Sequence, residues 1–194
     1  MRTLLFIFLL LTLGSFYVRE NRNPMAMCHD PNNAIESFAA FANDQAFLDA
    51  HPSPLPVEMK HQGIMVEFPV ADGANGKAFL VKAHGKTDKY LIIFQEWWGL
   101  NDYVKKEAAM WSHELGINVL ALDLYDGKVA TTSEEAGKLM QGADAKRISA
   151  IIEGAAKFAG DKADFRTLGW CFGGGWSLQG TLLLKDKVKA CVMY

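Results

Sequence analysis

Short apolar segments alternate with longer amphipathic ones from about Gln62 to the end of the chain, and this alternation limits the possible folds more than any other feature. Residues 90–94 and 118–122 are short and mostly apolar, which is typical of strands buried on both faces of a sheet. In residues 102–115 the apolar side chains cluster on one side, as in a helix that covers a sheet. The pattern predicts an α/β domain with a mostly parallel sheet and helices on both faces.

The other elements follow from the same periodicities and from turn residues. Asn101 predicts the start of the helix at 102–115, and Gly116 predicts its end. The turn-rich segment from Asp72 to Gly76 predicts a β-hairpin between the first two strands. Further strands are predicted at residues 63–69, 77–82, 165–170 and 188–194, and further helices at residues 133–142, 145–158 and 176–184.

The N-terminus is predicted to lie outside this domain. Residues 1–18 consist of a short basic start with Arg2 and an apolar run, which is the layout of a signal peptide. The run is shorter than the roughly 20 residues that a spanning helix prefers. We therefore expect an exported protein, periplasmic or secreted. Because no A-x-A cleavage site follows Gly14, an uncleaved N-terminal membrane anchor is the alternative, and membrane association is expected only in that case.

Residues 19–60 are predicted to be a polar linker, in which residues 34–50 form one helix. Three prolines, Pro52, Pro54 and Pro56, then favour an extended path. The α/β domain is expected to cover residues 61–194. Its last apolar strand is followed by no closing helix, so the domain is expected to be incomplete at its C-terminus.

Composition and motif spacing exclude several classes of function. With 194 residues, 50% hydrophobic residues and a net charge of −2, the chain can bury one sizeable core. Its 20 basic residues are scattered among 22 acidic ones, so nucleic acid is not an expected partner. The cysteines and histidines lack Cys-x-x-Cys or His-x-x-x-His spacing, so no metal site is predicted. No dinucleotide fingerprint is present, and no cofactor is expected.

A lone cysteine, Cys171, stands at the predicted turn between a strand and a helix, in the pattern G-x-C-x-G formed with Gly169 and Gly173. Such a turn exposes a nucleophile, and the positive end of the following helix is expected to lower the pKa of the thiol. The structural alternative is that the glycines only let the helix pack closely on the sheet, with Cys171 as a small buried hydrophobe. The residues alone leave both interpretations open.

The three cysteines of the chain leave at least one thiol unpaired. Cys28 lies in the polar segment after the signal, and Cys191 is predicted to be a buried strand residue. We expect Cys171 to be the free thiol.

Three ordered motifs carry a family resemblance: Gln95-Glu-Trp-Trp-Gly-Leu-Asn101, Leu122-Asp-Leu-Tyr125 and Gly169-Trp-Cys-Phe-Gly-Gly174. Over residues 63–194 the chain resembles the dienelactone hydrolase family of α/β-hydrolases. The resemblance implies an α/β-hydrolase fold. It also implies hydrolysis of small carboxylic esters or lactones through a cysteine nucleophile and an acyl-enzyme intermediate.

The same resemblance assigns roles to individual residues. Cys171 takes the place of the nucleophile, and Glu96 that of the glutamate that controls the protonation of the thiol. The backbone N–H groups of Phe172 and Trp97 take the place of the oxyanion hole. Residues expected to line the pocket or bind substrate are Trp98, Tyr125 and Lys128, the last as a point-charge substitute for the arginine that holds the substrate carboxylate in the family.

The family triad continues with an aspartate and a histidine after the nucleophile. In this sequence Asp186 is the only aspartate after Cys171, and all five histidines precede it. We therefore expect these 194 residues to be an inactive fragment of a carboxymethylenebutenolidase-like enzyme. Two alternatives stay open: a degenerate hydrolase that acts as a non-catalytic binding module, and a thiol redox protein that uses Cys171 with Cys191.

Overall fold

The computed structural model describes residues 43–55, 57 and 62–194. The predicted signal segment at residues 1–18 and most of the predicted linker, including Cys28, lie outside the described residues. Within the described part of the chain, no helix is both long enough and apolar enough to cross a membrane.

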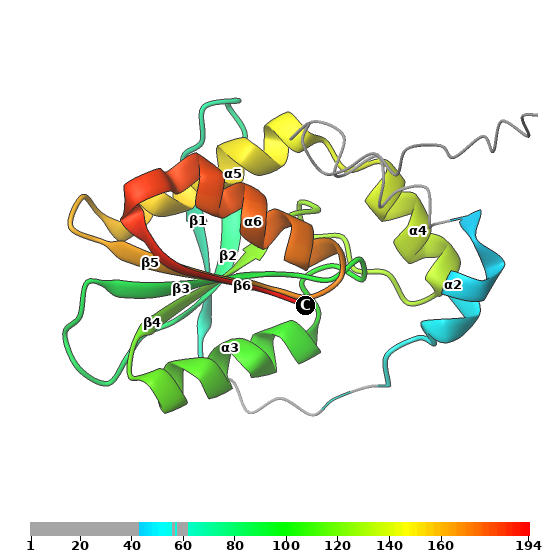
Figure 1. The fold of residues 1–194 in the computed structure, drawn as a ribbon, viewed down its shortest axis with the longest axis horizontal. Helices are drawn as coiled ribbons and strands as arrows, with labels where there is room; N and C mark the ends of the chain where they lie inside the picture. Colours follow the sequence, from blue (N-terminus) through cyan, green and yellow to red (C-terminus); the bar gives the residue numbers. More distant parts are fainter. Residues whose placement is uncertain (1–42, 56, 58–61) are drawn as a thin grey trace, which may run out of the picture.

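One sheet of six strands forms the centre of the molecule, in the order β1-β2-β4-β3-β5-β6 (Figure 1). β1 and β2 form the predicted hairpin, β2 also pairs antiparallel with β4, and all remaining neighbours pair in parallel. The mostly parallel sheet is therefore confirmed. The strands are β1 (Ile64–Phe68), β2 (Gly76–Val81), β3 (Lys89–Phe94), β4 (Asn118–Asp123), β5 (Asp164–Gly169) and β6 (Val188–Met193).

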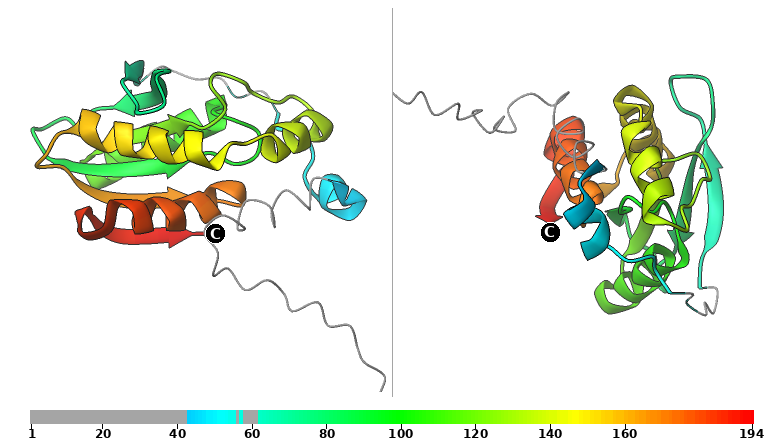
Figure 2. Two further views of the ribbon diagram at one scale, coloured as in Figure 1. Left: turned by 90° about the horizontal axis from the view of Figure 1, so that it is seen from above. Right: turned by 90° about the vertical axis from the view of Figure 1, so that its right-hand side faces the viewer.

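Helices cover both faces of this sheet, as the alternation predicts. α3 (Asp102–Leu115) packs on one face, while α5 (Ala145–Ala159) and α6 (Phe172–Leu184) pack on the other (Figures 1 and 2). Each face has its own cluster of buried apolar side chains. Two shorter helices, α2 (Gln45–Ala50) and α4 (Ser133–Gln141), lie side by side beyond one end of the sheet.

Local capping explains why the helices begin and end where the sequence predicts. The Asn101 side chain accepts a hydrogen bond from the N–H of Val104 at 3.1 Å and starts α3. Gly116, at φ 64°, ends the same helix in the left-handed conformation. Asp144 caps α5 in a similar way by accepting from the N–H of Lys146 at 2.8 Å.

Three predictions on local structure were wrong. The part of the 34–50 helix that lies within the described residues begins only at Gln45, because the Asp44 side chain caps the chain there. α6 begins at Phe172 rather than Trp176, since Gly173 and Gly174 are part of the helix and let it approach the sheet. Cys191 is exposed rather than buried, because β6 is an edge strand of the described sheet.

Candidate active site

Cys171 occupies the turn between β5 and α6, in a backbone conformation that side chains rarely adopt. Its φ is 53° and its ψ is −121°. A non-glycine residue held in such a region costs on the order of 1–3 kcal/mol, and strain of this kind clusters at functional sites. The N–H of Cys171 donates to the carbonyl of Tyr194 at 2.9 Å, so the turn is anchored beside the end of β6. The half-buried thiol is thus held at a strained strand-to-helix turn, as predicted.

Two glycines make this turn sterically possible. A Cβ atom on Gly169 would lie 2.0 Å from the carbonyl oxygen of Gly173. A Cβ on Gly173 would lie 2.3 Å from the carbonyl oxygen of Phe94, at the end of β3. The close helix-to-sheet packing of the structural alternative is therefore present, and it occurs together with the strained cysteine rather than in place of it.

Burial raises the pKa of the Cys171 thiol, and the negative charge of Glu96 raises it further. The N–H of Phe172, the first residue of α6, donates to the sulfur and acts in the opposite direction. The predicted lowering of this pKa by the helix start was wrong, because burial and Glu96 outweigh it. A protonated thiol in the resting state follows from this arrangement.

Glu96 lies two residues after the end of β3, at the carboxyl end of a strand, where open α/β sheets build their sites. Burial raises the pKa of its carboxyl group, and the nearby His51 lowers it in part. The structure thus brings together Cys171 and Glu96, as the sequence predicted, and it adds a histidine to this neighbourhood.

His51 is a residue of this site that the sequence analysis did not identify. Its ring stacks on Phe47 with 4.0 Å between the centroids and meets the edge of the Trp97 ring at 5.6 Å. Its carbonyl accepts a hydrogen bond from the Ser133 hydroxyl at 2.9 Å. No sequence pattern joins residue 51 to residue 96, because the contact depends on how the N-terminal segment crosses the domain.

Among the described histidines, His84 and His113 lie elsewhere. His84 is exposed in the loop between β2 and β3. His113 is exposed on α3, next to Glu114. Neither histidine contacts the elements around Cys171.

Tyr125 lies in the loop after β4 and places a buried phenol near the cysteine. Its ring centroid is 5.6 Å from that of Phe172. Burial raises the pKa of the phenol, and the charge of Cys171 adds to this effect. Within the described structure its buried hydroxyl has no hydrogen-bond partner. An unpaired buried hydroxyl costs free energy and is available to a substrate or water.

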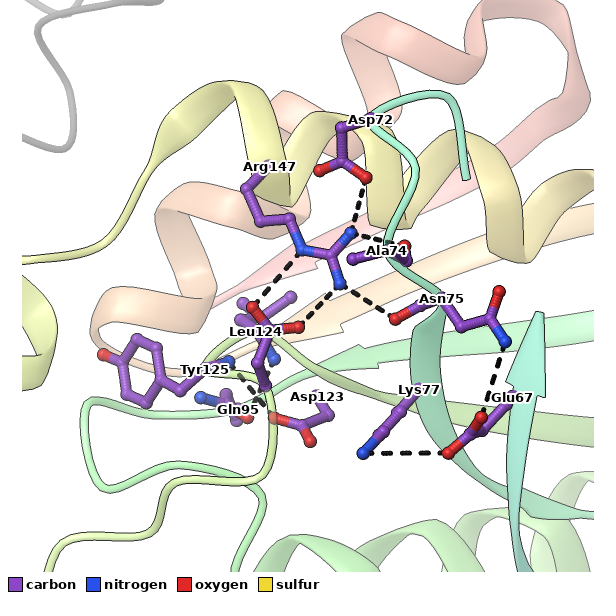
Figure 3. A network of polar contacts seen from close by, with 11 residues as sticks. Glu67, Asp72, Ala74, Asn75, Lys77, Gln95, Asp123, Leu124, Tyr125 and Arg147 are labelled. Carbon is purple, nitrogen blue, oxygen red and sulfur yellow. Dashed lines mark hydrogen bonds and ion pairs between the residues drawn. The ribbon is translucent and has the colours of Figure 1, made fainter. Parts of the chain in front are cut away.

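The loop that carries Tyr125 is fastened to the rest of the domain by a polar network (Figure 3). Arg147 of α5 donates to both carboxylate oxygens of Asp126, at 2.7 and 3.3 Å, and to Asp72 at 2.7 Å. The same guanidinium donates to the carbonyls of Ala74 and Asn75, at 2.8 and 2.9 Å. One partly exposed arginine therefore ties the β1–β2 turn to the loop after β4.

Two further hydrogen bonds hold the first residues of this loop. The N–H of Leu124 donates to the side chain of Gln95 at 3.3 Å, and the N–H of Tyr125 donates to Asp123 at 3.1 Å (Figure 3). Since Gln95 directly precedes Glu96, the loop and the end of β3 are joined next to the site. Lys128 is exposed at the far end of the loop, and its N–H donates to the carbonyl of Tyr125 at 3.2 Å.

A cavity of about 460 Å³ begins at Glu96 and extends along the start of α3. Trp98, predicted to line a pocket, forms part of its wall, whereas Lys128 does not. Within the described residues, no group of three or more His, Cys, Asp or Glu side chains is arranged to hold a metal ion. The residues that line the cavity are Pro52, Pro54, Glu96, Trp98, Asn101, Tyr103, Val104, Glu107 and Trp170.

Solved structures with this fold are α/β-hydrolases. A protein from Klebsiella pneumoniae assigned as a dienelactone hydrolase is 19% identical, with a TM-score of 0.51 over 67% of this chain and 59% of its own. An α/β-hydrolase from Penicillium sp. sh18 is 21% identical, with a TM-score of 0.51 over 72% and 45% of the two chains. One from Novosphingobium aromaticivorans is 12% identical, with a TM-score of 0.51 over 70% and 45%.

These likenesses show that the fold is that of the α/β-hydrolases, and the chain spans 59% or less of the length of the three structures. The model of the dienelactone hydrolase family matches residues 77–194, more than half of the chain. The chain therefore belongs to the dienelactone hydrolase family. No curated protein sequence matches it.

Proposed function

We propose that the full-length protein hydrolyses small carboxylic esters or lactones through Cys171. The observation that carries this proposal is the strained backbone of Cys171, at φ 53° and ψ −121°, on the turn between β5 and α6. Membership of the dienelactone hydrolase family supports the same reaction class. A small-molecule substrate is proposed, with the nucleophile supplied by the protein itself.

The proposed reaction proceeds through a thioester. Sγ of Cys171 attacks the carbonyl carbon, so that a C–S bond forms while the carbonyl oxygen becomes negatively charged. The N–H groups of Phe172 and Trp97 stabilise this oxyanion. The bond to the alcohol oxygen then breaks, and the alcohol leaves with the proton that came from the thiol. Water attacks the thioester, releases the acid and returns the thiol to its starting state.

Glu96 is proposed to hold the resting thiol protonated through its negative charge, since that charge raises the pKa of Cys171. Tyr125 is proposed to bind a substrate oxygen with its unpaired hydroxyl. For Lys128 the proposed role is weaker contact with substrate, because its side chain is exposed and lies outside the cavity wall.

The test is hydrolysis of p-nitrophenyl acetate and of a dienelactone by the full-length protein and by its Cys171→Ala variant. We expect hydrolysis by the parent protein and a loss of at least about 1,000-fold in the variant, given the size of nucleophile effects in related chemistry. Rapid acid quench and mass spectrometry of the intact protein are expected to show an acyl group on Cys171. Equal rates in both proteins would refute a cysteine nucleophile.

A non-catalytic binding module is the second candidate. It predicts ligand binding without turnover in the same assay. The redox alternative requires a bond between Cys171 and Cys191, and both are free thiols in the structure.

Export, periplasmic or secreted, is proposed from residues 1–18 alone, with the uncleaved anchor as its alternative. Mass spectrometry of the N-terminus of the protein made in its own cell distinguishes the two. A mature N-terminus after residue 14 supports cleavage, and an intact Met1 with the protein in the membrane fraction supports the anchor.

A further inference from the structure

The cavity beside Glu96 is closed in part by a segment that lies outside the region matched to the family. Pro52 and Pro54 belong to its wall, whereas the family match begins at residue 77. We propose that this cavity binds an uncharged, apolar or aromatic group of the ester substrate, and that residues 52–54 make it selective for such groups. This inference rests on the proposed hydrolase function.

The size and surface of the cavity fit such a group. Its volume of about 460 Å³ lies in the range of small-molecule sites. Trp98, Tyr103 and Trp170 contribute aromatic rings to the wall, and Pro52 and Pro54 contribute apolar ring surface. Flat aromatic side chains bind aromatic and apolar groups through large contact areas.

The charges of the wall disfavour an anionic substrate. Glu96 and Glu107 both line the cavity, and no basic side chain is among the described residues of its wall. Lys105 and Lys106 lie between the wall residues Val104 and Glu107 but are not part of the wall, and Lys105 pairs with Asp102 at 3.1 Å. A substrate carboxylate in this cavity would face two like charges without a partner, which is unfavourable in a partly buried site.

The segment that carries the two prolines is anchored by residues that directly precede it. The Ser133 hydroxyl of α4 donates to the carbonyl of His51 at 2.9 Å. The rings of Phe47 and His51 both pack edge-on against Trp97, with centroid distances of 5.0 and 5.6 Å. The wall is therefore held in place by the domain itself, and its shape can select a substrate.

The experiment compares kcat/KM of the full-length protein for phenyl acetate and for 4-acetoxybenzoate, which differ only by a carboxylate. We expect at least a 10-fold preference for phenyl acetate. The variant Glu107→Gln removes one carboxylate of the wall. It is expected to raise kcat/KM for 4-acetoxybenzoate at least 3-fold relative to kcat/KM for phenyl acetate. Equal kcat/KM for the two esters in the parent protein would overturn the proposal.

The contribution of the prolines is tested with the double variant Pro52→Ala, Pro54→Ala. We expect it to raise KM for phenyl acetate at least 3-fold more than it raises KM for methyl acetate. Leu55→Ala is the matched control, because Leu55 lies in the same segment, is 76% exposed and is not part of the wall. Equal effects of the double variant and the control would overturn the role of residues 52–54.

Binding distinguishes failure of this inference from failure of the proposed function. Acetanilide and 4-acetamidobenzoate are amide counterparts of the two esters, and their binding changes the fluorescence of Trp98 and Trp170 at the cavity. If the protein hydrolyses neither ester but binds acetanilide at least 10-fold more tightly than 4-acetamidobenzoate, the hydrolase proposal fails and the cavity proposal stands. Equal binding of the two amides would overturn the cavity proposal.

Discussion

The turn that carries Cys171 is held by backbone atoms, whereas the segment at residues 47–54 beside the cavity is held by side chains. In the turn, Gly169 and Gly173 let the start of α6 approach the carbonyl groups at the end of β3. In the segment, the Phe47 and His51 rings rest on Trp97, and Ser133 donates to a carbonyl. The turn has no room for an added side-chain atom at either glycine. In the segment at residues 47–54, single side chains can be replaced without such a clash.

We infer from this difference that the turn at Cys171 and the segment at residues 47–54 serve different purposes. Backbone packing of the kind at the turn fixes an atom to within a few tenths of an ångström, which a nucleophile requires. Side-chain packing at a partly exposed surface fixes a shape more loosely, which is sufficient to select among substrates. We therefore expect substitutions in the turn to affect folding and chemistry together, and those in the segment to affect mainly the choice of substrate.

The largest effect is expected for Gly173→Ala. The new Cβ would lie 2.3 Å from the Phe94 carbonyl oxygen and 2.5 Å from that of Gln95, so backbone must move. We expect the free energy of unfolding to fall by about 3 kcal/mol or more, the upper end of overpacking effects, and alkylation of Cys171 to lose its native pH dependence. Urea denaturation and iodoacetamide labelling measure the two effects.

Gly85→Ala is the matched control for that substitution. A Cβ on Gly85 would meet no atom within 4 Å, and its φ is not in the left-handed region. We expect its free energy of unfolding to differ from that of the parent protein by less than about 0.5 kcal/mol. If both alanine variants had the same stability, the turn would not depend on close backbone packing.

The same difference decides which features could be predicted from the sequence. The strand and helix boundaries agree with prediction to within about one residue over β1 to β5, because apolar periodicity and caps such as Asn101 act locally. The start of α6 was missed, since three successive glycines favour a loop, whereas Gly173 packs against the end of β3 and Gly174 against Tyr194 within the helix.

Cys171 could be predicted from its G-x-C-x-G turn, and Glu96 from the family resemblance. Both lie just after a predicted strand, and the ends of parallel strands meet at one edge of a sheet. His51 and the prolines could not be identified in this way. Their place beside Trp97 and in the cavity wall depends on side-chain contacts between segments more than 40 residues apart. No periodicity or motif encodes such a contact.

A second, smaller effect is expected for Arg147→Lys, which tests whether side chains also stabilise the loop of Tyr125. A lysine cannot donate to Asp126, Asp72 and two carbonyls at once in the geometry of a guanidinium. We expect the free energy of unfolding to fall by about 1.5–3 kcal/mol, the range for hydrogen bonds to charged groups, with a rise in KM because Tyr125 loses its fixed position.

Arg166→Lys serves as the comparison for Arg147. Arg166 pairs with Asp164 two residues away on the same strand, and both side chains are partly exposed. Its replacement is expected to cost less than about 1 kcal/mol, as for surface ion pairs. Thermal denaturation in parallel ranks the two variants, and a larger loss for Arg166→Lys would contradict the assigned role of Arg147.

Glu96→Gln is expected to change stability by less than about 1 kcal/mol but to change the pH dependence of the thiol. Since the charge of Glu96 raises the pKa of Cys171, its removal lowers that pKa. The thiolate then forms at lower pH, so the midpoint of iodoacetamide labelling moves to lower pH. Labelling is measured with Cys28 and Cys191 replaced by serine. A midpoint that stays in place or rises would contradict the coupling.

The smallest effect on stability is expected for Tyr125→Phe. Its hydroxyl is buried without a partner in the described structure, so its removal sacrifices no hydrogen bond. We expect the free energy of unfolding to stay within about 0.5 kcal/mol of the parent value or to rise. If the hydroxyl binds a substrate oxygen, kcat/KM falls by about 10-fold, the worth of one hydrogen bond of roughly 1.4 kcal/mol.

The free energy of unfolding and kcat/KM of Tyr125→Phe together decide whether the hydroxyl serves substrate binding or packing. A fall in kcat/KM without loss of stability means that the phenol is positioned for substrate, as is proposed for Cys171, although its loop is held by the side chain of Arg147. Loss of stability without a fall in kcat/KM means that the hydroxyl is satisfied within the protein and serves packing alone. In the first case, side-chain networks would position groups for the proposed reaction as well as for substrate choice.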